Sequence, residues 1–385
     1  MIPYSRQSIN KNDIKQITKV LNSNFLTQGP LVPTFEKNFS KKVGSKFAVA
    51  VNSATSGLHA ACLALNLKKG DIAWTVPTTF AATSNCILNC GASIDFVDIE
   101  DDTFNISVKL LEKKLKESLK KNKLPKVLIP VHLGGQPTDQ KKIYQLSKKY
   151  NFKIIEDASH SLGAKHYGEK VGSCKWSHLT VFSFHPTKVM TTGEGGMITT
   201  NNKKFYDNLN LIRNNGITKS HNKFRVKSKS KWYYEYQTTG FNFRMTDIQA
   251  ALGISQLKRL NLFVKKRNLV AEQYKKLLKK APVSFQKIQK YNLSTFHLLI
   301  VNFKQKNRKI NYDKIFNKFR KNKIFVNLHY MPLNKSILLK KRFKNKQYEN
   351  AETYSKTCLS IPVYYDIELK SIKKVCRVIE NILNV

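Results

Sequence analysis

The sequence lacks the defining features of several protein classes. No apolar run reaches the length of a membrane-spanning helix, and the first residues do not resemble a secretion signal. The six cysteines form no CxxC pair and no disulfide-framework spacing. We therefore expect a cytoplasmic protein with reduced thiols, no membrane partner and no metal site. Cys86 and Cys90, four residues apart, are expected to be small buried hydrophobic side chains.

Acidic residues are also scarce. The chain has 25 Asp and Glu against 68 Lys and Arg, which gives a formal net charge of +43. Such a charge favours nucleic acid or an anionic surface as a partner. Only 10 of the basic residues are arginine, the side chain whose fork matches phosphates and base edges. We therefore predict a solvated lysine surface and no specific nucleic-acid partner. A basic nucleic-acid-binding protein remains the alternative from a different class.

Basic residues are missing in turn from four segments, which we interpret as the walls of one core and its site. These segments are 47–67 and 70–108, with no Lys or Arg, 240–257, with only Arg244, and 176–202, with only Lys188. Lys188 follows an apolar strand pattern (179–184) and precedes a glycine-rich turn (191–196). Apolar surroundings disfavour the charged amine, so Lys188 is a candidate nucleophile for Schiff-base chemistry.

The 385 residues favour two domains. Strand and helix patterns alternate up to about residue 250, which predicts a large α/β domain (1–250) with a mostly parallel sheet. A different pattern predicts a smaller α+β domain (251–385). Its expected elements are a helix, a strand at 297–303, a helix, a strand at 324–328 and a final helix after Pro362. Residues 203–238, basic and aromatic, are expected to form a long excursion over the surface.

Several polar side chains lie where such a fold gathers ligands. Thr55 and Ser56 stand in a hydroxyl loop (52–57) between a strand and an expected helix at 58–67, and would bind phosphate or only cap that helix. Asp157 ends an apolar strand, so it is a functional acid or one half of a structural ion pair. Phe80 would stack on a planar ligand or belong to the core.

Four other residues carry weaker signals. His160 follows Asp157 by three positions, although a lone histidine is more often structural. Cys174 and His178 could suggest zinc together with His185, but their spacing matches no usual ligand pair. We therefore expect no zinc there.

Six motifs in order resemble the DegT/StrS-type sugar-nucleotide aminotransferases. They are N-S-A-T-S-G (52–57), T-T-F-A-A-T (78–83), H-x-x-G-x-P-x-D (132–139), E-D-A-S-H-S-L-G (156–163), F-S-F-H-P-T-K-x-x-T-T-G-E-G-G (182–196) and G-F-N-F-R-M-T-D-I-Q-A-A (240–251). The resemblance covers nearly the whole chain. It implies an α/β fold of the PLP-dependent transferase type I, pyridoxal 5′-phosphate (PLP) as cofactor, and a homodimer with a shared active site.

The resemblance also implies roles for individual residues. Lys188 would bind PLP as a Schiff base and then move the proton between the amino-acid Cα and the cofactor C4′. Asp157 would pair with the pyridinium nitrogen. The remaining expected cofactor contacts are Phe80 stacking on the ring, His160 near its phenolic oxygen, Thr55, Ser56 and Ser183 at the phosphate, and Asn242 at the phosphate from the partner subunit.

The opening I-P-Y-S-R-Q-S-I, L-T-Q-G-P (26–30) and G-S-C-K-W-S (172–177) resemble one branch of the family. This branch makes UDP-4-amino-4,6-dideoxy-N-acetyl-altrosamine on the way to pseudaminic acid. The implied reaction moves the amine of L-glutamate to the C4 ketone of a UDP-linked 4-keto sugar. GDP- or dTDP-linked keto sugars are the alternatives within the family. The positions expected to line the sugar pocket are Tyr4, Thr27, Ala54, His329 and Tyr330.

Overall fold

The computed structural model describes residues 1–226, 230–303 and 311–383. Its centre is a seven-stranded sheet in the order β1-β9-β8-β5-β4-β2-β3, in which only β9 runs against the other strands. The strands of this sheet are β1 (Phe47–Val51), β2 (Ile72–Thr75), β3 (Ser93–Phe96), β4 (Val127–Leu128), β5 (Lys153–Asp157), β8 (Leu179–Ser183) and β9 (Gly196–Thr200).

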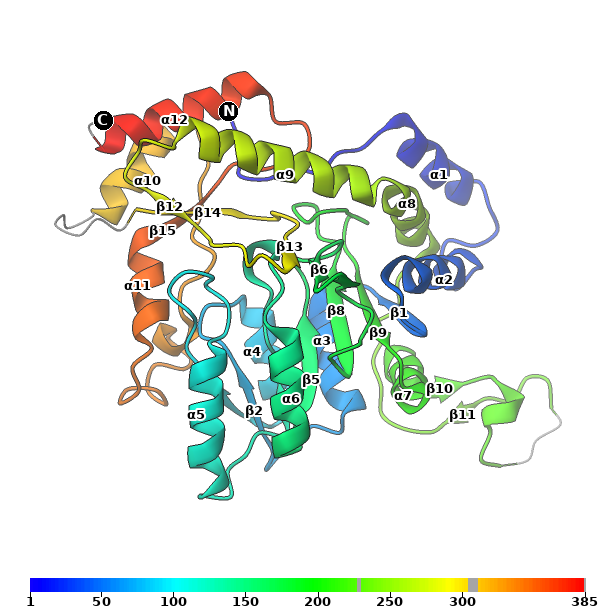
Figure 1. The fold of residues 1–385 in the computed structure, drawn as a ribbon. Helices are drawn as coiled ribbons and strands as arrows, with labels where there is room; N and C mark the ends of the chain where they lie inside the picture. Colours follow the sequence, from blue (N-terminus) through cyan, green and yellow to red (C-terminus); the bar gives the residue numbers. More distant parts are fainter. Residues whose placement is uncertain (227–229, 304–310, 384–385) are drawn as a thin grey trace.

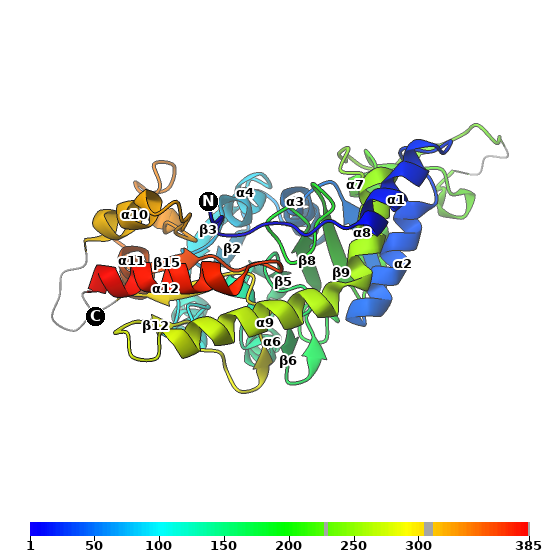
Figure 2. The same cartoon turned by 90° about the horizontal axis from the view of Figure 1, so that it is seen from above.

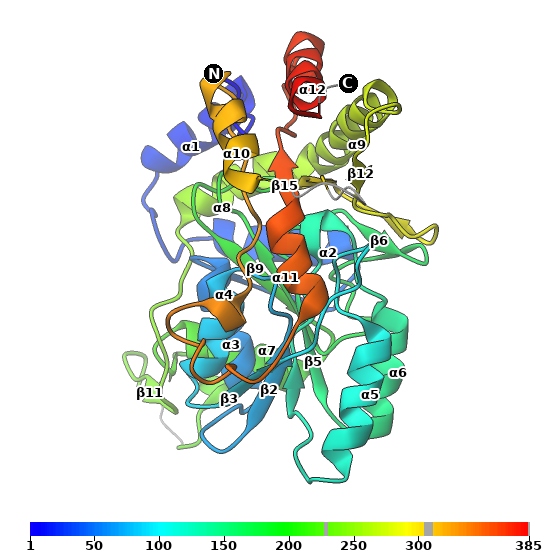
Figure 3. The same ribbon diagram turned by 90° about the vertical axis from the view of Figure 1, so that its left-hand side faces the viewer.

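Helices cover both faces of this sheet, with α3 and α4 on one side and α5 and α6 on the other (Figures 1 and 3). The helices are α1 (Lys11–Leu21), α2 (Leu31–Val43), α3 (Ala54–Ala64), α4 (Ala81–Leu88), α5 (Val108–Leu119), α6 (Gln140–Tyr150), α7 (Lys203–Arg213), α8 (Asp247–Lys258), α9 (Leu260–Leu277), α10 (Tyr312–Lys321), α11 (Glu349–Thr357) and α12 (Leu369–Leu383). Alternating strand residues face opposite ways: Val181 joins the core beside α3, whereas Phe182 packs on Phe39 of α2.

A second core lies at the C-terminal end of the chain. The antiparallel strands β12 (Ser284–Phe285), β14 (Leu299–Asn302) and β15 (Cys358–Ile361) pack with α9, α10 and α12. Helix α9 reaches this core from α8 (Figures 1 and 2). Two further small sheets are β13-β6-β7, of Asn292–Leu293, Lys165–His166 and Glu169–Lys170, and β10-β11, of Ile217–Thr218 and Glu235–Tyr236.

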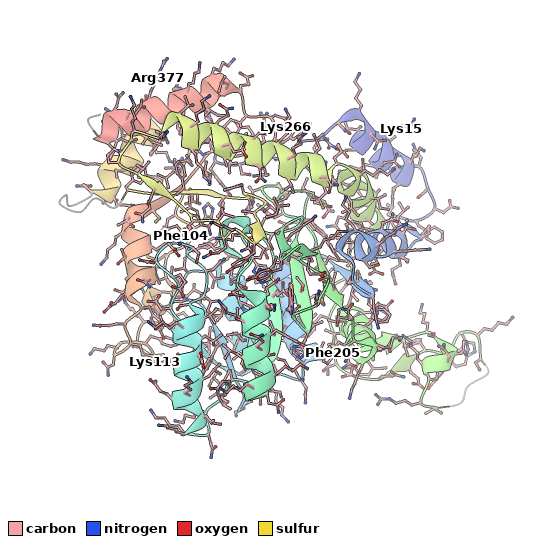
Figure 4. The ribbon with its side chains drawn as sticks, in the orientation of Figure 1. Lys15, Phe104, Lys113, Phe205, Lys266 and Arg377 are labelled. Carbon is pink, nitrogen blue, oxygen red and sulfur yellow. The ribbon has the colours of Figure 1, made fainter. Side chains whose placement is uncertain are left out.

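The lysine-rich surface is distributed over the outer faces of the helices. Lys15 on α1, Lys113 on α5 and Lys266 on α9 are exposed and point away from the body of the molecule (Figure 4). Solvated lysines of this kind agree with the sequence-based expectation.

Three expectations about individual elements are wrong. The hydroxyl loop is shorter than expected because Ser53 caps α3, which begins at Ala54. Residues 203–238 do not form one surface excursion, since they begin with α7, whose Leu209 and Ile212 are buried in the main core.

The third error concerns the small sheet. Residues 324–328 make only isolated bridges, at Ile324 and Asn327, and the strand that pairs with β14 is β15. The hairpin β10-β11 projects from the body (Figures 1 and 2). Residues 227–229, which belong to the same expected excursion, lie outside the described residues.

Candidate active site

A cavity of about 390 Å³ lies at the carboxyl ends of the central strands. Parallel strands of an open α/β sheet gather their following loops at this edge, where ligands usually bind. The cavity is lined by Tyr4, Ser53, Ala54, Thr55, Leu58, Thr79, Phe80, Ala82, Val131, Asp157, Ser159, His160, Ser183, His185, Thr187, Lys188, Glu194, Asn327, His329 and Tyr330. Ten of the thirteen expected site residues are in this set, so folding brings together segments from the whole chain.

Lys188 lies in the loop after β8 and faces the cavity. Loss of hydration lowers the pKa of its amine to about 8, and the nearby Asp157 carboxylate opposes this shift. Within the described residues, no hydrogen bond or ion pair occupies this amine. Lys114 also has a pKa lowered by burial to about 8, but its amine is paired with Asp95 at 2.9 Å. Lys188 is therefore the amine available for chemistry.

Asp157, at the end of β5, is 5% exposed and held on both carboxylate oxygens. The Thr83 hydroxyl donates to Oδ2 at 2.7 Å, and it also lies 2.8 Å from the Thr79 hydroxyl. The Ser159 hydroxyl donates to Oδ1 at 2.6 Å, as does its backbone N–H at 3.1 Å. These hydrogen bonds fix the direction of the carboxylate.

Aromatic and imidazole rings form another wall. The exposed Phe80 ring, just before α4, lies 5.7 Å from the Tyr330 ring. His160 Nε2 is 3.1 Å from the Tyr330 hydroxyl. Burial, followed by the Lys188 charge, lowers the pKa of His160 well below its usual value and that of His329 to about 3. Burial also raises the pKa of the Tyr330 hydroxyl. At neutral pH this wall is therefore uncharged.

The N-terminus of α3 forms a third wall, with Ala54 and Thr55 at its first two positions. The N–H groups of these positions have no partner within a helix, so this end can bind an anion. Gly196 of β9 allows the close approach, because a Cβ there would lie 2.8 Å from Ala54 N and from the Ser53 carbonyl. The Ser183 side chain lines the same cavity.

Three expected site residues do not line the cavity. The Ser56 hydroxyl donates to Asn52 Oδ1 at 2.6 Å. Thr27 forms a bridge with Thr246. Asn242 is exposed, and its carbonyl accepts from the Asn52 side chain at 3.3 Å. An Asn242 side chain acting from a second subunit would not appear within one chain.

Sequence reasoning missed several residues of the site. Thr83 and Ser159 both lie within motifs of the sequence, but no role was expected for either, although both hold Asp157. The other missed lining residues with polar side chains are Ser53, Thr79, His185, Thr187, Glu194 and Asn327. For Ser159 the available signal was a hydroxyl residue two positions after an expected acid.

The three residues considered for zinc have separate partners. Cys174 contacts the Thr180 and Thr199 hydroxyls, His178 accepts from the Ile154 N–H, and His185 contacts Thr187. Among the described residues, no group of three or more acids, cysteines or histidines could hold a metal ion.

In the same part of the chain, no helix is both long and apolar enough to cross a membrane.

The fold and the cavity together define a class: an α/β transferase of fold type I whose cavity holds a buried lysine amine and a fixed carboxylate. The sequence profile of the DegT/DnrJ/EryC1/StrS aminotransferase family matches residues 7–380. The chain belongs to this aminotransferase family, and the expected resemblance and fold class are confirmed.

Individual relatives agree over almost the full length. The chain is 38% identical to the UDP-4-amino-4,6-dideoxy-N-acetyl-beta-L-altrosamine transaminase of Campylobacter jejuni subsp. jejuni serotype O:23/36, over 97% of this chain and 95% of that protein. The structure of Helicobacter pylori PseC, an aminotransferase of pseudaminic acid biosynthesis, matches with a TM-score of 0.90 at 29% identity, over 100% and 99% of the two chains. The PLP form of Streptococcus pneumoniae Spr1654 matches with a TM-score of 0.88 at 25% identity, over 100% and 98%.

Proposed function

We propose that this aminotransferase uses PLP to move the amino group of L-glutamate to the C4 ketone of a UDP-linked 2-acetamido-2,6-dideoxy-4-hexulose, in pseudaminic acid or related surface-sugar biosynthesis. The observation that carries the proposal is the Lys188 amine, with a pKa lowered to about 8, in one cavity with the Asp157 carboxylate. The names of the C. jejuni transaminase and of H. pylori PseC support the sugar substrate.

The residues of the cavity fit PLP chemically. A carboxylate held by Thr83 and Ser159 suits a protonated ring nitrogen, and the α3 N-terminus suits a phosphate. The PLP form of Spr1654 supports the same cofactor. When bound, PLP supplies an electron sink that allows an amino group to leave one carbon and join another.

The protein groups then have separate tasks. Asp157 would balance the positive charge on the ring nitrogen of PLP. The Thr83 and Ser159 hydroxyl groups hold its carboxylate in one direction. Lys188, neutral in a useful fraction at physiological pH, takes the proton from the Cα of the amino donor. Phe80 would provide a flat apolar surface against the PLP ring. His160 would provide a neutral hydrogen-bonding group beside the same ring. Ser183 and Thr55 contribute hydroxyl groups to the phosphate end of the cavity.

The sugar would lie toward Tyr4, Ala54, His329 and Tyr330, which line the same cavity. Tyr4 packs on His329, with ring centroids 5.2 Å apart, so the N-terminal segment closes this side. We also propose a cytoplasmic homodimer in which Asn242 reaches the partner's cavity. The described chain has six free cysteines, which suits a reducing compartment.

The test is the visible absorption spectrum of the purified protein with PLP. We expect an absorption band of lysine-bound cofactor that disappears on adding L-glutamate and returns on adding the UDP-linked 4-keto sugar. Lys188→Ala should show no such band and no turnover. A band that persists with glutamate, or turnover by Lys188→Ala at a near-normal rate, would contradict the proposal.

The alternatives separate in the same assay. Return of the band with GDP- or dTDP-linked 4-keto sugars, but not with the UDP sugar, would assign a different nucleotide. A protein that binds no PLP but binds one nucleic-acid sequence or structure selectively would support the alternative class. Weak binding without selectivity would reflect only the lysine surface.

A further inference from the structure

A buried pair of histidines lies at the cavity wall, with His160 in the lining and His297 outside it. His160 and His297 are 4% and 2% exposed, with ring centroids 4.3 Å apart and ring planes tilted by 46°. His160 follows β5 of the main sheet, whereas His297 precedes β14 of the small sheet. The contact between the two rings therefore connects the main sheet with the small sheet. His160 of this pair also contacts the Tyr330 hydroxyl.

Backbone contacts fix the segment that carries His297. The Thr295 hydroxyl donates to the His160 carbonyl at 2.7 Å. The N–H groups of Thr295 and Leu298 donate to the carbonyls of Gly135 and Gly134, at 3.1 and 3.2 Å. These bonds fix the backbone on both sides of His297.

The polar atoms of the pair are not explained by a structural role alone. Neither Nδ1 atom has a hydrogen-bond partner within the described residues. An unpaired buried nitrogen is costly, so an apolar ring at position 297 would give a more stable core. The presence of His297, although its unpaired nitrogen lowers the stability of the core, suggests that this side chain has a role in the site.

The surroundings keep both rings neutral. Burial lowers the pKa of His297 well below its usual value, and the positive charges of Lys188 and Arg267 add to this effect. Burial likewise lowers the pKa of His160, with Lys188, His329 and His132 contributing. The pair is therefore a contact between two uncharged rings.

We propose that His297 is a positioning residue that packs against His160 and holds its ring in contact with Tyr330, so that His160 meets the cofactor in one orientation. This inference rests on the proposed function, which sets His160 beside the cofactor ring. His297 itself is absent from the residues that line the cavity. Its effect is exerted through His160.

The decisive measurement uses the cofactor-free protein and the ring NMR signals of His160. In the wild-type background, Tyr330→Phe should move these signals, because it removes a partner 3.1 Å from Nε2. In His297→Ala the same substitution should leave them almost unchanged, because His160 has already turned away. His297→Phe restores a ring at this position and should restore the response.

Kinetics of the PLP-loaded enzyme give a second readout. We expect His297→Ala to lower kcat about tenfold with little change in the KM for the sugar, since small displacements of reacting groups lower the reaction rate strongly. His297→Phe should recover most of this loss. The matched control is His178→Ala: His178 packs on Tyr144, with ring centroids 6.5 Å apart, and does not line the cavity. It should leave the response of His160 to Tyr330→Phe intact.

An unchanged His160 response in folded His297→Ala would overturn the inference and reduce His297 to a core residue. If that variant does not fold, His297→Phe provides the test, because it keeps a ring against His160 and removes only the ring nitrogens. Loss of the His160 response in folded His297→Phe would then overturn the inference. Failure of the proposed function would instead appear as absent PLP binding, with the NMR response preserved.

Discussion

At the scale of single residues, the site depends on the Lys188 amine, which is buried away from water. Apolar neighbours disfavour the charged form of Lys188, and the Asp157 carboxylate favours it. The balance leaves a pKa of about 8 instead of the usual 10.5. At pH 7 roughly a tenth of such amines are neutral, against fewer than one in a thousand for an unshifted lysine.

This shift predicts a pH profile. In the cofactor-free protein, reductive methylation of Lys188, followed by mass spectrometry, should rise with pH around a midpoint of about 8. Asp157→Asn should move the midpoint to lower pH, because it removes the charge that stabilises the ammonium. A midpoint near 10.5, or one that rises in Asp157→Asn, would contradict the electrostatic account.

The sequence predicted Lys188 and Asp157 better than it predicted the hydroxyl residues that hold Asp157 in place. Lys188 was conspicuous because basic residues are absent around it, and Asp157 because it ends an apolar strand. Thr83 and Ser159 were not singled out, since threonine and serine are common in loops and helix ends. Only the folded geometry shows their hydroxyls 2.7 and 2.6 Å from the Asp157 oxygens.

At the scale of elements, the α3 N-terminus depends on close packing against β9. Gly196→Ala would place a Cβ 2.8 Å from Ala54 N, closer than such atoms pack. We expect a loss of about 1–3 kcal/mol in the free energy of unfolding and weaker PLP binding, because the first turn must shift. Thermal unfolding and a PLP titration measure the two effects.

The matched control is Gly168→Ala, in the hairpin between β6 and β7. Gly168 has a φ of +77° and no atom within 4 Å of an added Cβ, so this change introduces backbone strain without a clash. It should lower stability but leave PLP binding unchanged. Equal losses of PLP affinity in both variants would contradict a specific role for the β9–α3 contact.

Two of the errors in element prediction have separate causes. Helix α7 has a polar sequence and contributes few buried side chains, so its pattern was hidden within a basic stretch. The expected strand at 324–328 is apolar enough to pair, but Ser360 opposite Asn327 belongs to β15, which takes the place beside β14. Which segment enters a sheet depends on competition between segments distant in sequence.

At the scale of the whole molecule, the shared site predicts complementation between inactive subunits. Asn242 lies outside the cavity of its own chain, and we propose that it serves the partner. A hybrid dimer of Lys188→Ala and Asn242→Ala subunits then contains one intact site, by two-fold symmetry. Random mixing should restore about a quarter of wild-type activity, because half of the dimers are hybrids with one site each.

Turnover of refolded mixtures against each variant alone measures this recovery. The recovery requires that Asn242→Ala alone be strongly impaired. Activity no greater than the sum of the two separate variants would show that each chain completes its own site. The control is a mixture of Lys188→Ala with itself, which should stay inactive.

The division into domains 1–250 and 251–385 remains a proposal. The second core, around α9, α12 and one face of β14, supports it, but Ile300 of β14 and Cys358 of β15 belong to the core of the main sheet. The proposed boundary falls within α8, and Ile2 forms a bridge with Ile324 of the second part. The start of the chain thus crosses to the C-terminal core, so the division is not strictly sequential.

The sequence by itself determined the family, the fold class, the central lysine and its acid, because these depend on local patterns and fixed spacings. Alternating apolar residues specify strands, and a lysine isolated among them has few structural explanations. Tertiary structure alone decided which hydroxyls hold Asp157, how His297 comes to pack behind His160, and which strand joins the small sheet. These depend on contacts between segments far apart in the chain, which are selected only when the whole core packs.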